Sequence, residues 1–106
     1  MKADALRGHL DSLILATVEN QPRHGYAIIE ALAARSGGEL DLPTGTVYPA
    51  LRRLEAAGYL HSDWSDDSGR RRRTYTLSRS GHKRLAAARD EWDQFARVVG
   101  GVLKPA

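Results

Sequence analysis

The stretch GTVYPALRRLEAAGYL, residues 45–60, constrains the fold most, because it predicts a helix with two unlike faces. Val47, Leu51 and Leu54 recur at the spacing of one helical face, and a glycine follows as a stop signal. The opposite face carries a tyrosine and two arginines. We therefore predict a helix over 44–57 whose apolar side lies in a core and whose polar side is free for another role.

Two helices are predicted before this stretch, and a hairpin and a long helix after it. The predicted inward residues are Leu6, Leu10, Leu13, Ile14 and Thr17 in the first helix and Tyr26, Ile29, Leu32 and Ala33 in the second. After the third helix the apolar period shortens to the alternation that is typical of strands. The predicted elements, in order, are helices over 6–19, 25–37 and 44–57, strands over 59–64 and 73–78 around a polar tip at 65–72, and a last helix after a Ser-Gly start.

This order predicts a winged helix-turn-helix, a mainly α fold with a β-hairpin wing in the α+β class. In that design the third helix enters the major groove of DNA, and the wing lies against the backbone or the minor groove. We expect residues 1–79 to form the DNA-binding domain and residues 80–106 to form a C-terminal dimerisation helix.

The distribution of charge favours a polyanionic partner. The chain has 106 residues and a net charge of +3, while residues 61–84 alone hold seven basic and three acidic side chains, which gives +4. Localised positive charge is expected of a protein that binds nucleic acid. A solvated basic hairpin is the alternative interpretation.

Several classes of protein are disfavoured. Without cysteine, neither a disulfide framework nor a thiolate metal site can form. No apolar stretch approaches the length of a membrane span, and the N-terminus lacks the pattern of a signal peptide, so a cytoplasmic protein without a membrane partner is expected.

Neither an enzyme nor a metal sensor is expected. The four histidines fall on different predicted elements, and no HExxH, GxSxG or P-loop pattern occurs. Three acidic residues flank Trp92, at positions 90, 91 and 93, but neighbours this close do not converge on one point of a helix. We expect no catalytic residue, no metal and no cofactor.

Residues on the third helix and the wing are predicted to contact DNA. Small residues open the helix and allow close approach, a proline stiffens its start, and a tyrosine and arginines supply donors for phosphates or guanine edges. The predicted DNA-binding residues are Thr44, Thr46, Tyr48, Pro49, Arg52, Arg53, Arg70 and Arg71. The alternative for this helix is an ordinary core helix with a solvated arginine face.

Four consecutive arginines, residues 70–73, follow the predicted tip of the wing. Alternate side chains of a strand point to opposite faces, so all four cannot touch one surface equally. We expect Arg70 and Arg71 to meet phosphate or the minor groove. The other two are expected to flank the strand, where one of them pairs with Asp63 or Asp66.

The last helix carries an apolar seam that predicts a partner helix. Apolar residues repeat every seven positions at two places of the heptad. A compact winged fold already has a core, so the seam favours a twofold dimer, which would read a pseudo-palindromic operator. The predicted dimerisation residues are Leu85, Trp92, Phe95, Val99 and Val102. Packing of this helix on the first helix of the same chain is the alternative.

The stretch GTVYPALRRLEAAGYL, then Trp64, then GRRRRTYTLSRSG resembles the PadR family of transcriptional regulators. The early LILATVENQPRHGYAII also matches the family's first two helices, so the resemblance covers nearly the whole chain. It implies a dimeric DNA-binding repressor of the short branch, which has a single C-terminal helix. Where the family has a serine or a similar residue near the start of the third helix, this chain has Pro43 and Thr44.

The same resemblance implies a small-molecule effector. Short members of the family hold a flat hydrophobic ligand at the dimer centre, beside a tryptophan of the last helix that Trp92 matches by its spacing. The residues implied to line this space are His9, Ser12, Ala88, Trp92, Phe95 and Ala96. Phe95 is bulky, and filling of the space by its ring is the alternative.

A protein-interaction module remains the rival function, because fold does not fix function. In that reading the seam and the basic wing bind another protein rather than DNA. Salt separates the two, since a protein that contacts several phosphates loses affinity steeply and log-linearly as salt rises.

Overall fold

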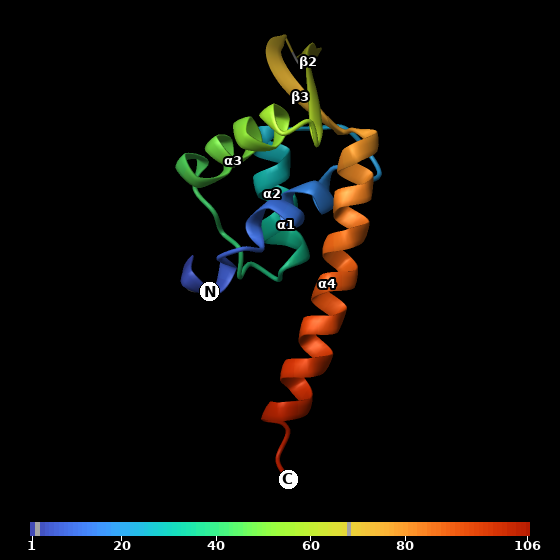
Figure 1. The fold of residues 1–106 in the computed structure, drawn as a ribbon. Coiled ribbons are helices and arrows are strands. Elements are labelled where there is room, and N and C mark those ends of the chain that lie inside the picture. The colour runs from blue at the N-terminus through green and yellow to red at the C-terminus, as the bar shows by residue number, and fades with distance from the viewer. Residues whose placement is uncertain (2, 68) are drawn as a thin grey trace.

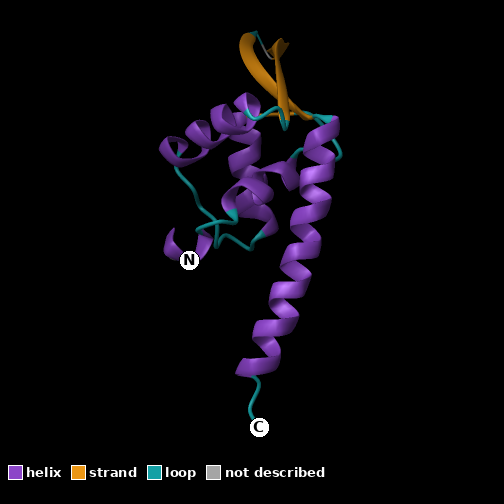
Figure 2. Ribbon diagram, in the orientation of Figure 1, coloured by secondary structure: helices purple, strands orange, loops and turns teal. Residues whose placement is uncertain are grey.

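The structure, a computed structural model, describes residue 1, residues 3–67 and residues 69–106. These residues form four α-helices, a short 3-10 helix and a three-stranded sheet (Figure 1, Figure 2). The elements are η1 (Ala3–Leu6), α1 (Leu10–Thr17), β1 (Arg23–His24), α2 (Gly25–Arg35), α3 (Thr44–Ala56), β2 (Leu60–Asp67), β3 (Arg70–Leu77) and α4 (Arg79–Leu103). The prediction of a mainly α, winged member of the α+β class is confirmed.

Helices α1, α2 and α3 form a body from which a wing and a long helix project. Strands β2 and β3 extend beyond the body next to α3, whereas α4 runs beside α1 and continues well past it (Figure 1). The molecule accordingly measures 59 × 28 × 21 Å. The wing and the free length of α4 therefore lie at opposite ends.

One apolar core holds the body together, and α3 supplies its predicted face. Val47, Leu51 and Leu54 are buried there, as expected. The buried cluster consists of Ile14, Leu15, Val18, Ile28, Leu32, Leu40, Val47, Ala50, Leu51, Leu54, Leu60, Tyr75 and Leu85. Burial of each large aliphatic side chain contributes about 1.5–3 kcal/mol. This burial determines which side of α3 faces outward.

The first two helices differ from the prediction. Helix α1 begins at Leu10 rather than at residue 6, because Gly8 has φ of +82° and interrupts the helical backbone. In α2 the expected inward residue Tyr26 is 58% exposed, and Ile28 is buried instead. The inward face is rotated because α2 packs through Ile28 and Leu32, which lie at helical spacing on one side.

The wing is longer, and its loop shorter, than predicted. β2 continues to Asp67 and β3 begins at Arg70, although residues 65–72 were expected to form a loop. The outer wing lies away from the core, so no alternation of apolar residues marks its strands in the sequence. The strand order is β1-β3-β2, and the unpredicted β1 pairs with Tyr75 and Thr74. Two residues are too few for any periodic signal.

Close packing fixes the start of α4. The backbone N–H of Gly81 donates to the hydroxyl of Ser78 at 3.0 Å, which caps the helix. A Cβ at Gly81 would overlap the backbone oxygen of Tyr59, so only glycine allows this approach. One turn later Leu85 enters the core, where it is 3% exposed. The first turns of α4 therefore belong to the body of the protein.

Two contacts then hold α4 along α1. The guanidinium of Arg89 donates to both carboxylate oxygens of Glu19, at 2.7 and 2.8 Å. This hydrogen bonding lowers the pKa of Glu19 below its usual range. Further along, the ring of His9 meets Trp92 edge-on with 5.5 Å between centroids. The direction of α4 is thus set by contacts at two positions along the helix, Arg89 and Trp92.

We predict that Gly81→Ala destabilises the protein by about 1–3 kcal/mol, because the added methyl group overlaps backbone and must displace it. Thermal unfolding followed by circular dichroism measures the effect. Gly45→Ala in α3 is the matched control, since its Cβ meets open space and should cost nothing. Equal melting temperatures for the two variants would contradict the close approach.

Candidate nucleic-acid interface

The start of α3 presents a small, accessible surface. Thr44, Gly45 and Thr46 are exposed, and the helix opens from Pro43, whose extended backbone accepts the first N–H groups. Pro49 lies inside α3, in its second turn, rather than within the first turn as expected. It therefore leaves the carbonyl of Gly45 without its helical N–H partner.

Tyr48 is not a purely outward residue. Its ring is half-buried and packs directly on Gly25, where a Cβ would overlap the ring. The ring of Tyr26 meets it edge-on with 6.5 Å between centroids. Burial raises the pKa of Tyr48, with a smaller contribution from Tyr26. Tyr48 thus joins α2 to α3 as well as bordering the exposed surface.

The two arginines of α3 differ in their surroundings. Both are exposed, but the guanidinium of Arg53 donates to Oδ1 of Asp11 at 2.6 Å. Among the residues whose side chains the structure describes, Arg52 has no such ion pair. Sequence spacing could not reveal the pair, because its members are 42 positions apart. Of the two, Arg52 is the one without an ion-pair partner among the side chains that the structure describes.

The inner wing arginines hold the base of the wing. Nε of Arg73 donates to Oγ of Ser62 at 2.7 Å, and its Nη2 lies 4.0 Å from Oε2 of Glu55 on α3. Nη1 of Arg72 lies 2.8 Å from Nε2 of His24. The expected pairing of one of them with Asp63 or Asp66 is therefore wrong. In the register of the hairpin these two arginines lie opposite Ser65 and Trp64, and the nearer partners are Glu55 of α3 and His24 of β1.

The wing and the body enclose a basic hollow, here called the wing hollow, of about 440 Å³. Its lining consists of His24, Gly25, Tyr26, Tyr48, Trp64, Arg70, Arg71, Arg72, Arg73 and Tyr75. All four wing arginines thus border one concave surface with three tyrosines. Sequence analysis found the arginines and Tyr48 but did not assign Trp64, Tyr26 or His24 to this site.

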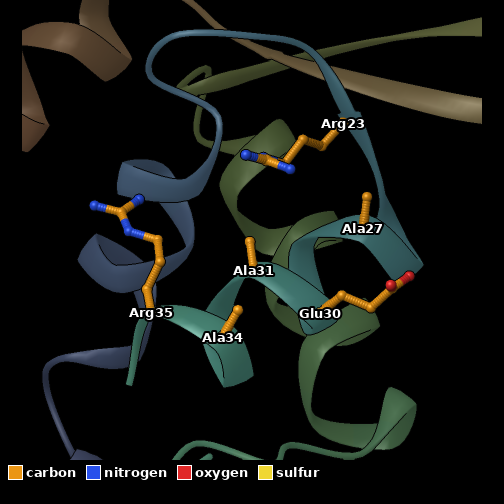
Figure 3. Close-up of a pocket in the computed structure, with 6 residues that line it drawn as sticks. All are labelled: Arg23, Ala27, Glu30, Ala31, Ala34 and Arg35. Carbon is orange, nitrogen blue, oxygen red and sulfur yellow. The ribbon is translucent and has the colours of Figure 1, made fainter. Parts of the chain in front are cut away.

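A second hollow lies along α2, and the two arginines that line it have structural roles. Nε of Arg23 donates to the backbone oxygen of Thr17 at 2.6 Å, and Nη1 of Arg35 donates to that of Ala16 at 3.2 Å. Figure 3 shows both guanidiniums directed to the side of α1 and Glu30 extending the other way. Cations that meet the last carbonyls of a helix stabilise its C-terminus. These charges complete the fold of α1.

The free part of α4 exposes a cluster of large apolar residues. Trp92 and Phe95 are each 53% exposed, and their rings stack with 5.9 Å between centroids. The cluster continues toward the C-terminus through Val98, Val102 and Leu103, with Val99 half-buried beside them. We call this cluster the α4 surface. It contains the residues of the expected seam except Leu85, which is buried in the core of the body.

The residues implied to line an effector space fall on both helices. His9 lies 5.5 Å from Trp92 and 6.4 Å from Phe95 between ring centroids. Ser12 donates to the backbone oxygen of His9 at 3.0 Å. On α4, Ala88 is half-buried and Ala96 is exposed.

Within residues 1, 3–67 and 69–106, no group of three or more metal-ligating side chains converges. In the same residues, every helix is too short or too polar to cross a bilayer.

Comparisons with known proteins agree on one family. The profile described as the Transcriptional regulator PadR-like family matches residues 14–87. Transcriptional regulator Rv3488 of Mycobacterium tuberculosis is 36% identical over 80 residues, which are 74% of this chain and 62% of that protein. The structure of a transcriptional regulator from Clostridium thermocellum has a TM-score of 0.88 at 26% identity, covering 96% of this chain and 100% of that one. A PadR family transcription regulator from Clostridium difficile has a TM-score of 0.79 at 34% identity, covering 91% and 99%.

We predict that stability falls at alkaline pH partly through Tyr48. Burial raises its folded-state pKa, so stability is unaffected below the ordinary tyrosine pKa of about 10. It is lost as the pH rises through the raised value, because the unfolded chain releases the proton first. Urea unfolding across this range should show a shallower loss for Tyr48→Phe than for the parent chain. Parallel curves would contradict the assignment.

Proposed function

Because this chain belongs to the PadR-like family of transcriptional regulators, a family of DNA-binding proteins that are not enzymes, we propose that it is a dimeric repressor released from its operator by a small flat hydrophobic molecule. The observation that carries this proposal is the α4 surface, since Trp92, Phe95 and Val102 are exposed in a single chain. Isolated exposed apolar residues need no explanation, but a contiguous row of them marks an interaction site. A regulator of transcription acts at the chromosome, so the proposal includes a cytoplasmic location.

DNA binding in this proposal uses the exposed start of α3 and the wing. Thr44 and Thr46 approach the major groove, and Arg52, about two turns along α3, supplies donors for a phosphate or a base edge. Arg70 and Arg71 extend the contact to the backbone or the minor groove. Tyr48, Pro49 and Arg53 are also assigned to the interface, although Tyr48 and Arg53 each have a structural contact of their own. Their contribution is therefore partly to shape α3.

Dimerisation in this proposal uses the part of α4 that projects beyond the body. Two such helices packed side by side cover Trp92, Phe95, Val99 and Val102 in both chains, and Leu85 adds rigidity from within each core. The chain thus divides by function into residues 1–79, which bind DNA, and residues 80–106, which join the subunits. A twofold dimer presents two copies of α3 about one turn of DNA apart, as a pseudo-palindrome requires.

The effector in this proposal binds between the subunits, next to Trp92. Two indoles related by the twofold axis offer flat faces, and the aromatic contact of each with His9 connects that place to the DNA-binding part. His9, Ser12, Ala88, Phe95 and Ala96 are the other lining residues. A ligand wedged there changes the angle between subunits and hence the spacing of the two α3 helices.

We predict salt-sensitive and sequence-selective binding to a duplex from the promoter region upstream of the protein's own gene. Fluorescence anisotropy against a scrambled duplex at several salt concentrations measures it, and Arg52→Ala should weaken binding by about 1–3 kcal/mol without lowering the melting temperature. The exposed wing residue His61, replaced by alanine, is the control. Weak binding that is equal on both duplexes would instead favour a protein-interaction module.

We predict that Val102→Asp converts the dimer to a monomer, because it places two charges in the apolar contact. Val102 is 80% exposed within one chain, so the substitution leaves the fold of the subunit intact. Sedimentation velocity measures the change. Arg97→Asp, on the opposite side of α4, should remain dimeric. A dimer that survives Val102→Asp would place the interface elsewhere.

A further inference from the structure

Trp64 of the wing lies against two guanidiniums. It projects from β2, opposite Arg73 in the register of the hairpin, and is 55% exposed. The Cζ atoms of Arg71 and Arg73 each lie 5.0 Å from the centroid of its ring. Distances under about 6 Å are those of cation–π contacts, for which tryptophan is the strongest aromatic partner.

The alternation of a strand explains why these three side chains meet. Arg71 and Arg73 are two positions apart, so they share a face of β3, and Trp64 shares it from the neighbouring strand. Ser62 and Tyr75 form the next pair on that face, and Ser62 bonds to Glu55 of α3 at 2.5 Å. The face that carries the stack therefore meets α3 at the base of the wing, and the three stacked side chains are among those that line the wing hollow.

We propose that Trp64 is a positioning residue for DNA binding, which holds the guanidinium of Arg71 in place for a phosphate of the duplex. This inference rests on the proposed role of the wing in contacting DNA. It concerns a residue that composition and charge do not single out, because an indole has no charge to offer the backbone.

Arg71 depends on the indole more than Arg73 does. Arg73 is also held by Ser62 at 2.7 Å and lies 4.0 Å from Glu55. For Arg71 the structure gives the stack on Trp64, and among the described side chains no ion pair. Within the described part of the chain, removal of the indole therefore leaves Arg73 with two partners and Arg71 without an ion pair.

An aromatic face is a suitable support for an arginine that must bind an anion. A carboxylate partner would occupy the N–H donors and neutralise the charge, whereas stacking uses only the plane of the guanidinium. The donors at its edge stay available for the two-point contact that arginine makes with phosphate. Restricting the long side chain beforehand also lowers the entropy lost when DNA binds.

The test is a double-mutant cycle on the full-length chain with Trp64→Ala, Arg71→Ala and the double variant. Binding is measured to a fluorescent duplex of random sequence at low salt and along a salt series, since phosphate contacts do not depend on sequence. Trp64→Ala should weaken binding by about five- to tenfold. The double variant should bind about as weakly as Arg71→Ala, whose salt slope should be lower by about one phosphate contact.

Two further variants separate a positioning role from a general one. Trp64→Phe keeps an aromatic face and should retain most of the affinity, and His61→Ala, an exposed change on the same strand, should retain all of it. Melting temperatures should stay within a few degrees of the parent, because the outer wing lies outside the core. A loss in Trp64→Phe as large as in Trp64→Ala would overturn the proposal.

The cycle also distinguishes the positioning role of Trp64 from the proposed contact of the wing with DNA. Additive losses from Trp64→Ala and Arg71→Ala would mean that the indole contacts DNA by itself, which overturns positioning. A loss with Arg71→Ala but none with Trp64→Ala overturns it too, while the wing's contact with DNA stands. No loss with Arg71→Ala would overturn the role of this arginine in the proposed function and the inference that rests on it.

Discussion

The burial of one side of α3 is the interaction on which the rest of the molecule depends. Val47, Leu51 and Leu54 pack into the core, and this alone decides which residues of the helix can meet a partner. The base of the wing joins the same core through Tyr75, and the start of α4 joins it through Leu85. Because these elements share one core, the exposed start of α3, the wing and the projecting helix keep a defined arrangement. Polar residues with little packing of their own are positioned by apolar residues beneath them.

The features of the fold and of the candidate interface that could be predicted are those that leave a local pattern in the sequence. The face of α3 follows from a period of 3.6 residues, and the bounds of that helix agree with its glycine stop. Contacts between distant residues have no such signal: Arg53 meets Asp11, and Tyr48 packs on Gly25, which the sequence presents only as a glycine before a helix. The outer wing escaped prediction because strands in solvent need no apolar alternation. The two-residue β1 and the wing hollow exist only once the sheet is assembled.

Arginine is the most informative residue here only after its partners are known. Arg23 and Arg35 complete the C-terminus of α1, while Arg89 fastens α4 to Glu19. Arg53 and Arg73 connect α3 to α1 and to the wing. Net charge counts all of these equally, although each of them already bonds to a partner within the chain. The four wing arginines instead border the wing hollow, and two of them, Arg71 and Arg73, lie against the indole of Trp64.

Helix α4 has a mechanical consequence. From Leu85, which is fixed in the core, to Leu103 at its end the helix rises about 27 Å, mostly without support from the body. A tilt of about one degree at its base therefore moves its far end by about 0.5 Å. A rotation of a few degrees, small enough to need no repacking of the core, becomes a displacement comparable to the radius of an atom. The helix therefore acts as a lever. It is anchored in the core by Leu85, and the ion pair between Glu19 and Arg89 restrains its tilt.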